Sequence, residues 1–434
     1  MSVLPENRSE TVFKDFKPAL TAKQAIVEAN RCLYCADAPC IKACPTSINI
    51  PEFIRKIGTG NVAGSAKTIF ESNVLGSSCA RICPVEVLCV GDCVYNEMGV
   101  PPIEIGKLQR YATDTAIAEG WEFFEAGPDT GKSVGLIGGG PASLAAAHRL
   151  RRFGHRVTIY ESRQILGGLN TYGIAPYKLR ADAAVDEIEW LMKIGGIEVK
   201  TGVSVPVDLS WDALLAKHDA LFMGFGLGPD SAMALPGGDL AGVEGAVEWI
   251  ERMKLGLVDV SSIRHALVIG GGNTAMDAVR ELCGLGVQNV SLVYRGTEAA
   301  MSGYAHEWTE AKNEGVAALW QTLPVAFEGT SGLCATRCVR LDEAKRPIAG
   351  SEFTIPSDLA LIAIGQAKIG DLCAGLGIAL DKGKVVVGPG GQTTHPKVFA
   401  GGDCVSGGQE VVNAVAEGRD AAIAMDALFR EGRL

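Results

Sequence analysis

The sequence predicts an α/β protein in which a small helical region precedes two doubly wound parallel sheets, the second inserted into the first. Three observations predict this. Eight of the 13 cysteines lie between Cys32 and Cys93. A strand, a glycine turn, a helix and a second strand begin at Ser133 and again at His265. A third glycine turn, Gly401-Gly402-Asp403, follows an apolar segment near the end. These patterns place helices first and two nucleotide-binding folds after them.

The composition is that of a soluble globular protein. The chain has 434 residues, 47% of them hydrophobic and 21% charged, which favours about two to four domains. A net charge of −10 disfavours nucleic-acid binding, because a phosphate backbone repels such a surface. No apolar run reaches the ~18 residues that span a bilayer, and MSVLPENRSE lacks the features of a secretory signal. We expect a cytoplasmic protein without nucleic-acid or membrane partners.

The region before Ser133 is predicted to be helical. KQAIVEANRCL, PEFIRKIGTGNVAGSAKTIF and IGKLQRYATDTAIAEG carry apolar residues at spacings of three and four. The acidic stretch EFFEAGPDTGK contains Gly and Pro and is expected to be a linker. The expected domains are residues 1–126 for the helical domain, 127–232 with 370–434 for one nucleotide-binding domain, and 233–369 for the other.

The cysteines have the spacings of metal ligands. Cys32, Cys35, Cys40 and Cys44 are spaced C-x2-C-x4-C-x3-C-P, and Cys79, Cys83, Cys89 and Cys93 are spaced C-x3-C-P-x4-C-x3-C. Thiols of the cytoplasm stay reduced, so the pattern favours metal over disulfides. Two zinc sites and two [4Fe–4S] clusters compete here, since both take thiolates. The Cys-Pro ending and the distant second group favour iron–sulfur, because in two-cluster ferredoxins the last cysteine of a run ligates the other cluster.

The first glycine turn predicts a dinucleotide site. Gly138, Gly140 and Ser143 fit the G-x-G-x-x-G template, with serine in place of the third glycine. Gly140 allows the backbone to approach a pyrophosphate at the helix N-terminus. Glu161 ends the next strand, where it can accept hydrogen bonds from a ribose. The candidate cofactor-binding residues are Gly138, Gly140, Pro141, Ala142, Ser143 and Glu161.

The second glycine turn predicts a nicotinamide dinucleotide site, with candidates Gly270, Gly272, Asn273, Thr274 and Ala275. Here Arg295, not an acid, follows the next strand, and a base at that point suits the 2′-phosphate of NADP. Gly296 comes next, however, so no paired basic clamp forms, and Arg295 could equally stack on adenine. From these residues alone the choice between NADH and NADPH stays open.

The third glycine turn suits FAD. Gly401 and Gly402 can admit the flavin chain, and Asp403 can bind its ribityl hydroxyls. A helix that begins near Val411 to Asn413 would direct its dipole at the pyrimidine edge and stabilise the negative charge of reduced flavin. A flavin also favours iron–sulfur clusters over zinc, because clusters carry single electrons and zinc does no redox work.

Six segments, in this order, resemble the N-terminal half of dihydropyrimidine dehydrogenase: RCLYCADAPCIKACPTSI, LGSSCARICPVEVLCVGDCVYNE, GGGPAS, GGLNTYGIAPYKL, GGGNTAMD and FAGGD. The resemblance is greatest to the separate bacterial NAD/FAD subunit of that family and extends from about Phe16 to the end. The small subunit of glutamate synthase shares the same plan. The resemblance implies that Gly168, Leu169 and Lys178 lie near the flavin.

The resemblance also implies the ligands of two [4Fe–4S] clusters. One is expected to use Cys32, Cys35, Cys40 and Cys93, and the other Cys44, Cys83, Cys89 and the amide of Gln109. Cys79, which spacing alone would select as the eighth ligand, is then a spare thiol. NADPH enzymes of the family have a second base after Arg295 and another at the position of Met301. Gly296 and Met301 therefore favour NADH here.

An electron-input subunit is the function that the resemblance implies. NADH would reduce FAD, and electrons would leave singly through the clusters to an FMN-containing catalytic subunit, within a heterotetramer, which interconverts uracil or thymine and their 5,6-dihydro forms. The chain has no length for an FMN barrel of ~250 residues, so the pyrimidine site is expected on that partner. No catalytic side chain is expected, because the cofactors do the chemistry. The alternatives are a glutamate synthase small subunit that uses NADPH, and a zinc-stabilised, non-catalytic scaffold.

Overall fold

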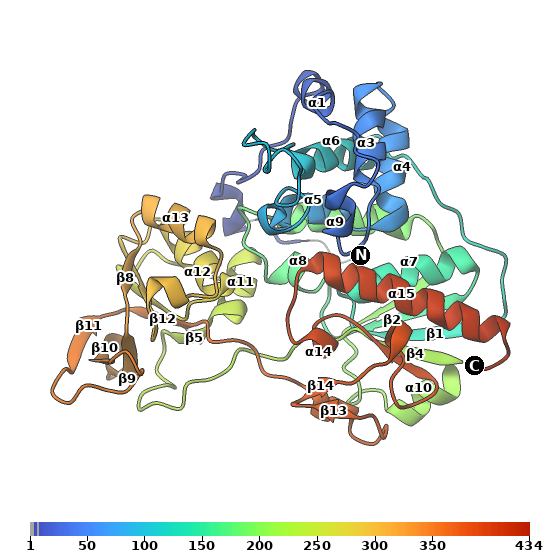
Figure 1. Cartoon of the computed structure of the whole chain (residues 1–434). Helices are drawn as coiled ribbons and strands as arrows, with labels where there is room; N and C mark the ends of the chain where they lie inside the picture. Colours follow the sequence, from blue (N-terminus) through green and yellow to red (C-terminus); the bar gives the residue numbers. More distant parts are fainter. Residues whose placement is uncertain (1–3, 7) are drawn as a thin grey trace.

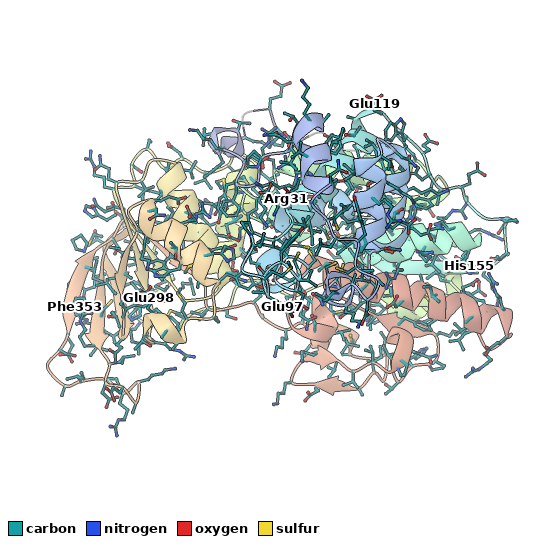
Figure 2. The ribbon with its side chains drawn as sticks, turned by 45° about the horizontal axis from the view of Figure 1, so that its top comes forward. Arg31, Glu97, Glu119, His155, Glu298 and Phe353 are labelled. Atoms are coloured by element: carbon teal, nitrogen blue, oxygen red, sulfur yellow. The ribbon has the colours of Figure 1, made fainter. Side chains whose placement is uncertain are left out.

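The computed structural model describes residues 4–6 and 8–434 and has three parts (Figure 1). A helical region lies at the top, a first α/β unit lies below it, and a second α/β unit lies to the side. Figure 2 shows the same division, with Glu298 and Phe353 in the second unit and His155 at the opposite end, in the first. Within the described residues, no helix is both long and apolar enough to cross a bilayer.

Short helices build the helical region, as the apolar spacings predict. They are α1 (Ala22–Ala29), α2 (Pro39–Lys42), α3 (Ile50–Gly58), α4 (Val62–Ser72), α5 (Gly76–Ile82) and α6 (Ile105–Ala118), with the 3-10 turns η1 (Ser9–Val12) and η2 (Val85–Val87). Thr21 caps α1 and Asn61 caps α4, each with its side-chain oxygen. Helix α3 buries Phe53, Ile54 and Ile57 on one face, which anchors it in the core.

The first α/β unit contains a five-stranded parallel sheet in the order β15-β4-β1-β2-β3. Its strands are β1 (Ser133–Ile137), β2 (Arg156–Glu161), β3 (Ile197–Thr201), β4 (Ala220–Met223) and β15 (Val398–Ala400). Its helices are α7 (Pro141–Phe153), α8 (Leu169–Tyr172), α9 (Ala181–Met192), α10 (Trp211–Lys217), α14 (Asp403–Ser406) and α15 (Val411–Arg430). Ala400 of β15 pairs with Met223 of β4, so the C-terminal segment completes the first sheet.

The second α/β unit contains the parallel sheet β5-β12-β6-β7-β8 and a small antiparallel sheet, β11-β10-β9, which the sequence patterns do not predict. The parallel strands are β5 (Val243–Gly245), β6 (His265–Ile269), β7 (Asn289–Val293), β8 (Ala317–Leu319) and β12 (Leu359–Ile362). The antiparallel strands are β9 (Thr322–Gly329), β10 (Leu333–Arg340) and β11 (Phe353–Pro356), and the helices are α11 (Ala246–Lys254), α12 (Asn273–Gly284) and α13 (Ala305–Asn313), with the 3-10 turn η3 (Glu298–Ala300).

A return segment joins the two units, with the turns η4 (Gly370–Cys373) and η5 (Pro389–Gly391) and the ribbon β13 (Leu380–Asp381) and β14 (Lys384–Val385). In chain order, the strands of the second unit therefore lie between β4 and β15, which are neighbours in the first sheet. The predicted fold class, a helical domain followed by two nucleotide-binding folds of which one is inserted in the other, is confirmed. The residue limits predicted for the three domains stay a prediction.

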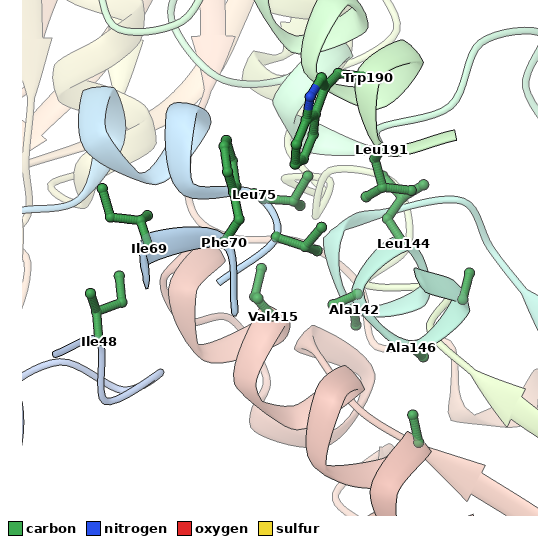
Figure 3. Close-up of a cluster of buried hydrophobic side chains, with 14 of the residues drawn as sticks. Ile48, Ile69, Phe70, Leu75, Ala142, Leu144, Ala146, Trp190, Leu191 and Val415 are labelled. Carbon is green, nitrogen blue, oxygen red and sulfur yellow. The ribbon is translucent and has the colours of Figure 1, made fainter. Parts of the chain in front are cut away.

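One hydrophobic core joins the helical region to the first unit (Figure 3). The rings of Phe70 in α4 and Trp190 in α9 stack with their centroids 4.1 Å apart, and Leu144 of α7 and Val415 of α15 belong to the same cluster. The expected linker also joins this core, because the ring of Phe123 lies edge-on to that of Trp190 with the centroids 6.3 Å apart. The cysteines are therefore held firmly over the first sheet.

Candidate functional site

Four cysteines line a first cavity in the helical region: Cys32, Cys35, Cys40 and Cys93. Ile50 and Ile54 of α3 form its apolar wall. Tyr95 closes the turn after Cys93, since its hydroxyl donates to the carbonyl of Arg31 at 2.6 Å. The set is the one that the family resemblance implies for one cluster, and it combines three cysteines of the first group with the last of the second.

A second cavity is lined by Cys44, Cys83, Cys89 and Gln109, and also by Cys79. The Nε2 of Gln109 donates to the carbonyl of Gly76 at 2.7 Å, which leaves Oε1, the atom with which an amide binds metal, without a hydrogen-bond donor among the described residues. Ile50 lines both cavities and separates them. Cys79 shares the second cavity, so its expected role as a spare thiol stays a prediction.

Burial favours the neutral form of several thiols in these cavities. Burial raises the pKa of Cys40 and of Cys89 to about 12. The hydrogen bond with Cys79, together with burial, raises the pKa of Cys83. Bound iron would deprotonate such thiols, because a cation inverts the local preference for the neutral form. Within residues 4–6 and 8–434, no three His, Cys, Asp or Glu side chains are close enough to hold a single metal ion; the cysteines line the cavity walls instead.

The first glycine turn joins β1 to α7 and is held by Glu161. Oε2 of Glu161 accepts the N–H of Gly139 at 2.6 Å, and Oε1 accepts the N–H of Arg163 at 2.8 Å. Gly138 has φ +91°, and a β-carbon there would meet the carbonyl oxygen of Gly224 at 2.6 Å. The buried carboxylate therefore shapes the turn, whether or not it also binds a ribose.

Three glycine-containing segments converge at the N-terminus of α7. Gly140 is its N-cap, Pro141 and Ala142 follow, and the α-carbon of Gly140 lies 3.1 Å from a β-carbon built on Gly168. Gly402, with φ +78°, lies against Ala142 from the C-terminal turn. Glycine backbone, without side chains, therefore surrounds the place where a pyrophosphate would lie and allows its close approach. The dipole of α7 favours an anion at the same place. Leu169 begins α8 next to this point.

Ser143 and Asp403 take different parts in this convergence. The buried Ser143 packs against Gly224 of the next turn, where a β-carbon would lie 2.3 Å from its hydroxyl, so only a small residue fits at this position of the template. Asp403 begins α14, and its Oδ1 accepts the N–H of Gln409 at 3.1 Å. Burial raises the pKa of Asp403. Asn413 lies in the first turn of α15.

Lys178 lies between the two α/β units. Its Nζ contacts Asp277 Oδ1 of α12 at 2.7 Å and Glu307 Oε1 of α13 at 2.5 Å. Burial opposes the charge, but the two carboxylates prevail and raise the pKa of Lys178. The ammonium therefore links the two α/β units through these ion pairs. The expected position of Lys178 near a flavin stays a prediction.

The second glycine turn lies between β6 and α12. Gly270 has φ +152°, Gly272 is the N-cap of α12, and Asn273, Thr274 and the buried Ala275 form its first turn. Oδ1 of Asn273 accepts the N–H of Tyr304 at 3.1 Å, which ties the turn to the segment before α13. The fold therefore presents the free N–H groups of α12 beside this turn, as an anion site requires.

Arg295 follows β7 on the surface, and its guanidinium has no ion pair within the described part of the chain. The next residue, Gly296, is buried, and a β-carbon there would lie 2.7 Å from Cε1 of Tyr294. The ring of Tyr294 thus occupies the space that a second basic side chain would need. A second basic residue beside Arg295 is therefore excluded by the packing of Tyr294 as well as absent from the sequence.

Two features of the nucleotide site have no counterpart among the sequence candidates. Ala363 to Gly365 leave the end of β12 beside β6, and a β-carbon on Gly270 would meet the carbonyl of Ala363 at 2.2 Å. The glycine that ends LALIAIG, with φ +112°, was the available signal. Tyr304 of the second unit also donates to Glu410 Oε1 at 2.7 Å, at the N-terminus of α15. This contact brings the two nucleotide sites together, and no local pattern predicts it.

Family models match two parts of the chain. The model described as dihydropyrimidine dehydrogenase domain II, 4Fe-4S cluster, matches residues 8–121, and the pyridine nucleotide-disulphide oxidoreductase model matches residues 132–418. The first covers the cysteine cavities and the second covers all three glycine turns. FAD, NAD(P)H and iron–sulfur are thereby supported as the cofactors, and the zinc scaffold is not.

Curated relatives resemble the chain over nearly its whole length. The NAD-dependent dihydropyrimidine dehydrogenase subunit PreT of Escherichia coli K12 is 37% identical over 412 residues, which are 95% of this chain and 96% of the relative. The glutamate synthase [NADPH] small chain of Halomonas elongata is 34% identical in an alignment of 449 positions that covers 94% of this chain and 91% of the relative. Both alternatives within the enzyme class therefore have relatives of similar closeness.

Solved structures share the fold of the two α/β units. FprA of Mycobacterium tuberculosis in complex with NADPH has a TM-score of 0.58 at 17% identity and covers 69% of this chain and 86% of its own. The thioredoxin reductase of Lactococcus lactis has a TM-score of 0.55 at 21% identity and covers 69% of this chain and 99% of its own. At these identities the likeness shows the fold alone.

Proposed function

The chain belongs to the family of NAD(P)H-dependent flavin and iron–sulfur oxidoreductases that includes the PreT subunits and the glutamate synthase small chains, and on this premise we propose that it is the electron-input subunit of an NAD-dependent dihydropyrimidine dehydrogenase. Its partner in this proposal is an FMN-containing, PreA-like catalytic subunit that interconverts uracil or thymine and their 5,6-dihydro forms, within a heterotetramer. The proposal includes two [4Fe–4S] clusters, one in each cysteine cavity.

One observation carries the proposed relay: the second cysteine cavity borders the N-terminus of α15 (Val411–Arg430), which we name the flavin helix because it follows the third glycine turn. Val412, the second residue of α15, lines this cavity together with Cys44 and Gln109. The same helix begins beside the third glycine turn, where Gly402 lies against Ala142 of α7. A ligand at the glycine turns and a ligand in the cavity would therefore lie on two sides of one helix end. This adjacency is what a conduit from a dinucleotide to a cluster requires.

When bound, FAD takes a hydride from the nicotinamide and the clusters carry electrons one at a time. The side chains bind, orient and exclude water. Asn273 fixes the nicotinamide turn through Tyr304, and Tyr304 in turn holds Glu410 at the flavin helix. Ile50 and Ile54 keep the wall of the first cavity apolar. We assign no protein acid or base.

NADH is the donor in this proposal. Arg295 is single, and Gly296 is packed against Tyr294, so the pair of bases that would hold a 2′-phosphate is missing. A glutamate synthase small subunit is the second candidate, because the small chain of Halomonas elongata is 34% identical. We also propose a cytoplasmic location, which the 13 free cysteines support, since thiols persist in a reducing compartment.

The test is to purify the chain anaerobically, alone and with any polypeptide that copurifies. The isolated chain should reduce an artificial dye with NADH, more efficiently than with NADPH, and should leave uracil unchanged. The complex should contain FMN and should convert uracil with NADH. Uracil reduction by the chain alone would refute the split between subunits. A strict NADPH preference with glutamine-linked activity of the complex would establish the second candidate instead.

A further inference from the structure

Asn73 is a buried polar residue in the second cysteine cavity that neither the sequence motifs nor the family resemblance assigns. It lies in the short connection between α4 and α5, and its exposed fraction is 0%. Its backbone N–H closes α4 by donating to the carbonyl of Ile69 at 2.9 Å. The residue lines the cavity together with Cys83 and Gln109. Asn73 thus both ends helix α4 and lines the second cysteine cavity.

The hydrogen bonds determine which way the amide of Asn73 points. Oδ1 accepts the N–H of Leu75 at 3.0 Å. Oδ1 is therefore directed at the backbone, and Nδ2 is the atom on the other side of the amide plane. Nδ2 is fully buried and has no hydrogen-bond partner within the described part of the chain. A buried N–H2 without an acceptor is costly, so its retention calls for an acceptor that belongs to the cavity.

The residues that surround Nδ2 limit the chemistry of that acceptor. The described cavity residues that can bind metal are four thiols and one amide oxygen, from Cys44, Cys79, Cys83, Cys89 and Gln109. Gln109 Nε2 donates to the carbonyl of Gly76, and Oε1 of Gln109 accepts no hydrogen bond from Asn73 Nδ2. Sulfur, of a thiolate or of an inorganic sulfide, is the acceptor that such a ligand set supplies when it holds iron.

We propose that Asn73 Nδ2 donates a hydrogen bond to a sulfur of the iron–sulfur cluster held by Cys44, Cys83, Cys89 and Gln109, and thereby raises the reduction potential of that cluster. The inference rests on the proposed function, which places a cluster in this cavity. Hydrogen bonds to the sulfurs are among the factors that set cluster potentials, because a donor stabilises the more negative, reduced state. The neutral Gln109 acts in the same direction, since it contributes no charge where a thiolate would. Asn73 would thus be a positioning and tuning residue of the cluster on the flavin side.

Two substitutions separate the lost donor from added charge. Asn73→Leu removes the donor without charge, and Asn73→Asp keeps the shape and the acceptor for Leu75 but replaces the donor with a carboxylate. Asn61→Asp is the matched control, because Asn61 caps the other end of α4 through Gly64 N at 2.9 Å and aspartate caps equally well. The measurement is an anaerobic redox titration of the holoprotein, followed by electron paramagnetic resonance.

Both Asn73 variants should make the potential of one cluster more negative. A tenfold change in the reduction equilibrium, which is 59 mV for a one-electron couple, is the expected scale. The other cluster, the flavin and the Asn61→Asp protein should titrate like the wild type. An unchanged potential in Asn73→Leu, or a shift in Asn73→Asp alone, would overturn the inference.

Iron and acid-labile sulfide contents distinguish this inference from the proposed function. If the wild type contains neither, the proposed function itself fails. If wild type and variants load equally and titrate alike, only the role of Asn73 fails. Where a variant does not load, wild-type protein labelled with 15N in its asparagine side chains decides. A 15N coupling to the reduced cluster supports the inference, and its absence overturns it, because Asn73 is the asparagine that lines this cavity in the described structure.

Discussion

Lys178 of the first α/β unit and Glu307 of the second form an ion pair that is almost removed from solvent, with Nζ and Oε1 2.5 Å apart. The same ammonium contacts Asp277, whose Oδ1 also accepts the hydroxyl of Tyr177 at 2.7 Å. One cation of the first unit therefore contacts two helices of the second, α12 and α13. The relation between the two nucleotide sites depends on this contact and on the bond between Tyr304 and Glu410.

We predict that Lys178→Met destabilises the protein, because it leaves the carboxylates of Asp277 and Glu307 buried without their cation. The loss of one partner of a buried ion pair costs about 3–5 kcal/mol. The thermal unfolding midpoint should fall, and reduction of the bound flavin by NADH should slow while FAD content is retained. Lys42→Met is the control, since its pair with Asp37 is 2.7 Å long but exposed and should contribute little. An unchanged midpoint would show that the contact does not hold the units together.

We predict that Gln109→Leu lowers the iron content and that Cys79→Ser does not. Both residues line the second cavity, and the expected ligand set includes the amide and omits the thiol. Analysis of iron and sulfide per chain, after anaerobic purification, measures the difference. If Cys79→Ser loses iron and Gln109→Leu loads fully, the assignment is wrong. Cys79, the residue that spacing alone selects, would then be the ligand in place of Gln109.

Gly140→Ala should lower the affinity for FAD by tenfold or more without unfolding the first sheet. Gly140 has φ −80°, which alanine tolerates, and a β-carbon there would have Gly168 Cα at 3.9 Å as its nearest protein contact. The added methyl group therefore intrudes only on a ligand. Gly388→Ala is the control, with φ −90° and its nearest atom at 3.8 Å. The measurement is the flavin content after dilution. If both variants retain flavin equally, the pyrophosphate does not bind at this turn.

The buried Lys254 should make stability rise in alkaline solution. Burial lowers the pKa of Lys254 to about 8, although its Nζ donates to the carbonyls of Ile174 and Leu179 at 2.8 and 2.9 Å. Between about pH 8 and the ordinary lysine pKa of 10.5, the unfolded chain binds the proton that the folded chain has lost. Raising the pH through this window therefore stabilises the folded state, by about 1.4 kcal/mol per pH unit.

The check on Lys254 is the difference in unfolding midpoint between the wild type and Lys254→Met at several pH values from 7 upward. The wild type should gain on the variant from about pH 8 and stop gaining near the ordinary lysine pKa. Parallel curves for the two proteins would contradict the buried, easily deprotonated lysine. Substitution also removes the hydrogen bonds of Nζ to three carbonyls, those of Asn170, Ile174 and Leu179, so the comparison depends on the slope and not on the midpoint at one pH.

Much of the nucleotide-binding part could be predicted because its signals are local. The turn at Gly138 and the turn at Gly270 each follow an apolar strand and precede a helix, and the structure has strands and helices at those places. The small antiparallel sheet from Thr322 to Pro356 escaped prediction, because its central strand β10 does not alternate regularly between buried and exposed residues and pairs with β9 through two register shifts. Lys178 shows the limit most clearly: its segment is recognisable, but its two carboxylate partners come from another unit.

The sequence by itself determined what neighbouring positions can encode: the cysteine spacings, the strand–glycine–helix turns, and the return of a third turn after the second unit. Only the tertiary structure decided that Cys93 faces the cavity of Cys32, that Gln109 and Asn73 face that of Cys44, and that Val412 connects this cavity to the flavin helix. The physical reason is that a cavity is formed where segments far apart in the chain pack against one another. Residue spacing along any one of those segments carries no record of which partners it will meet.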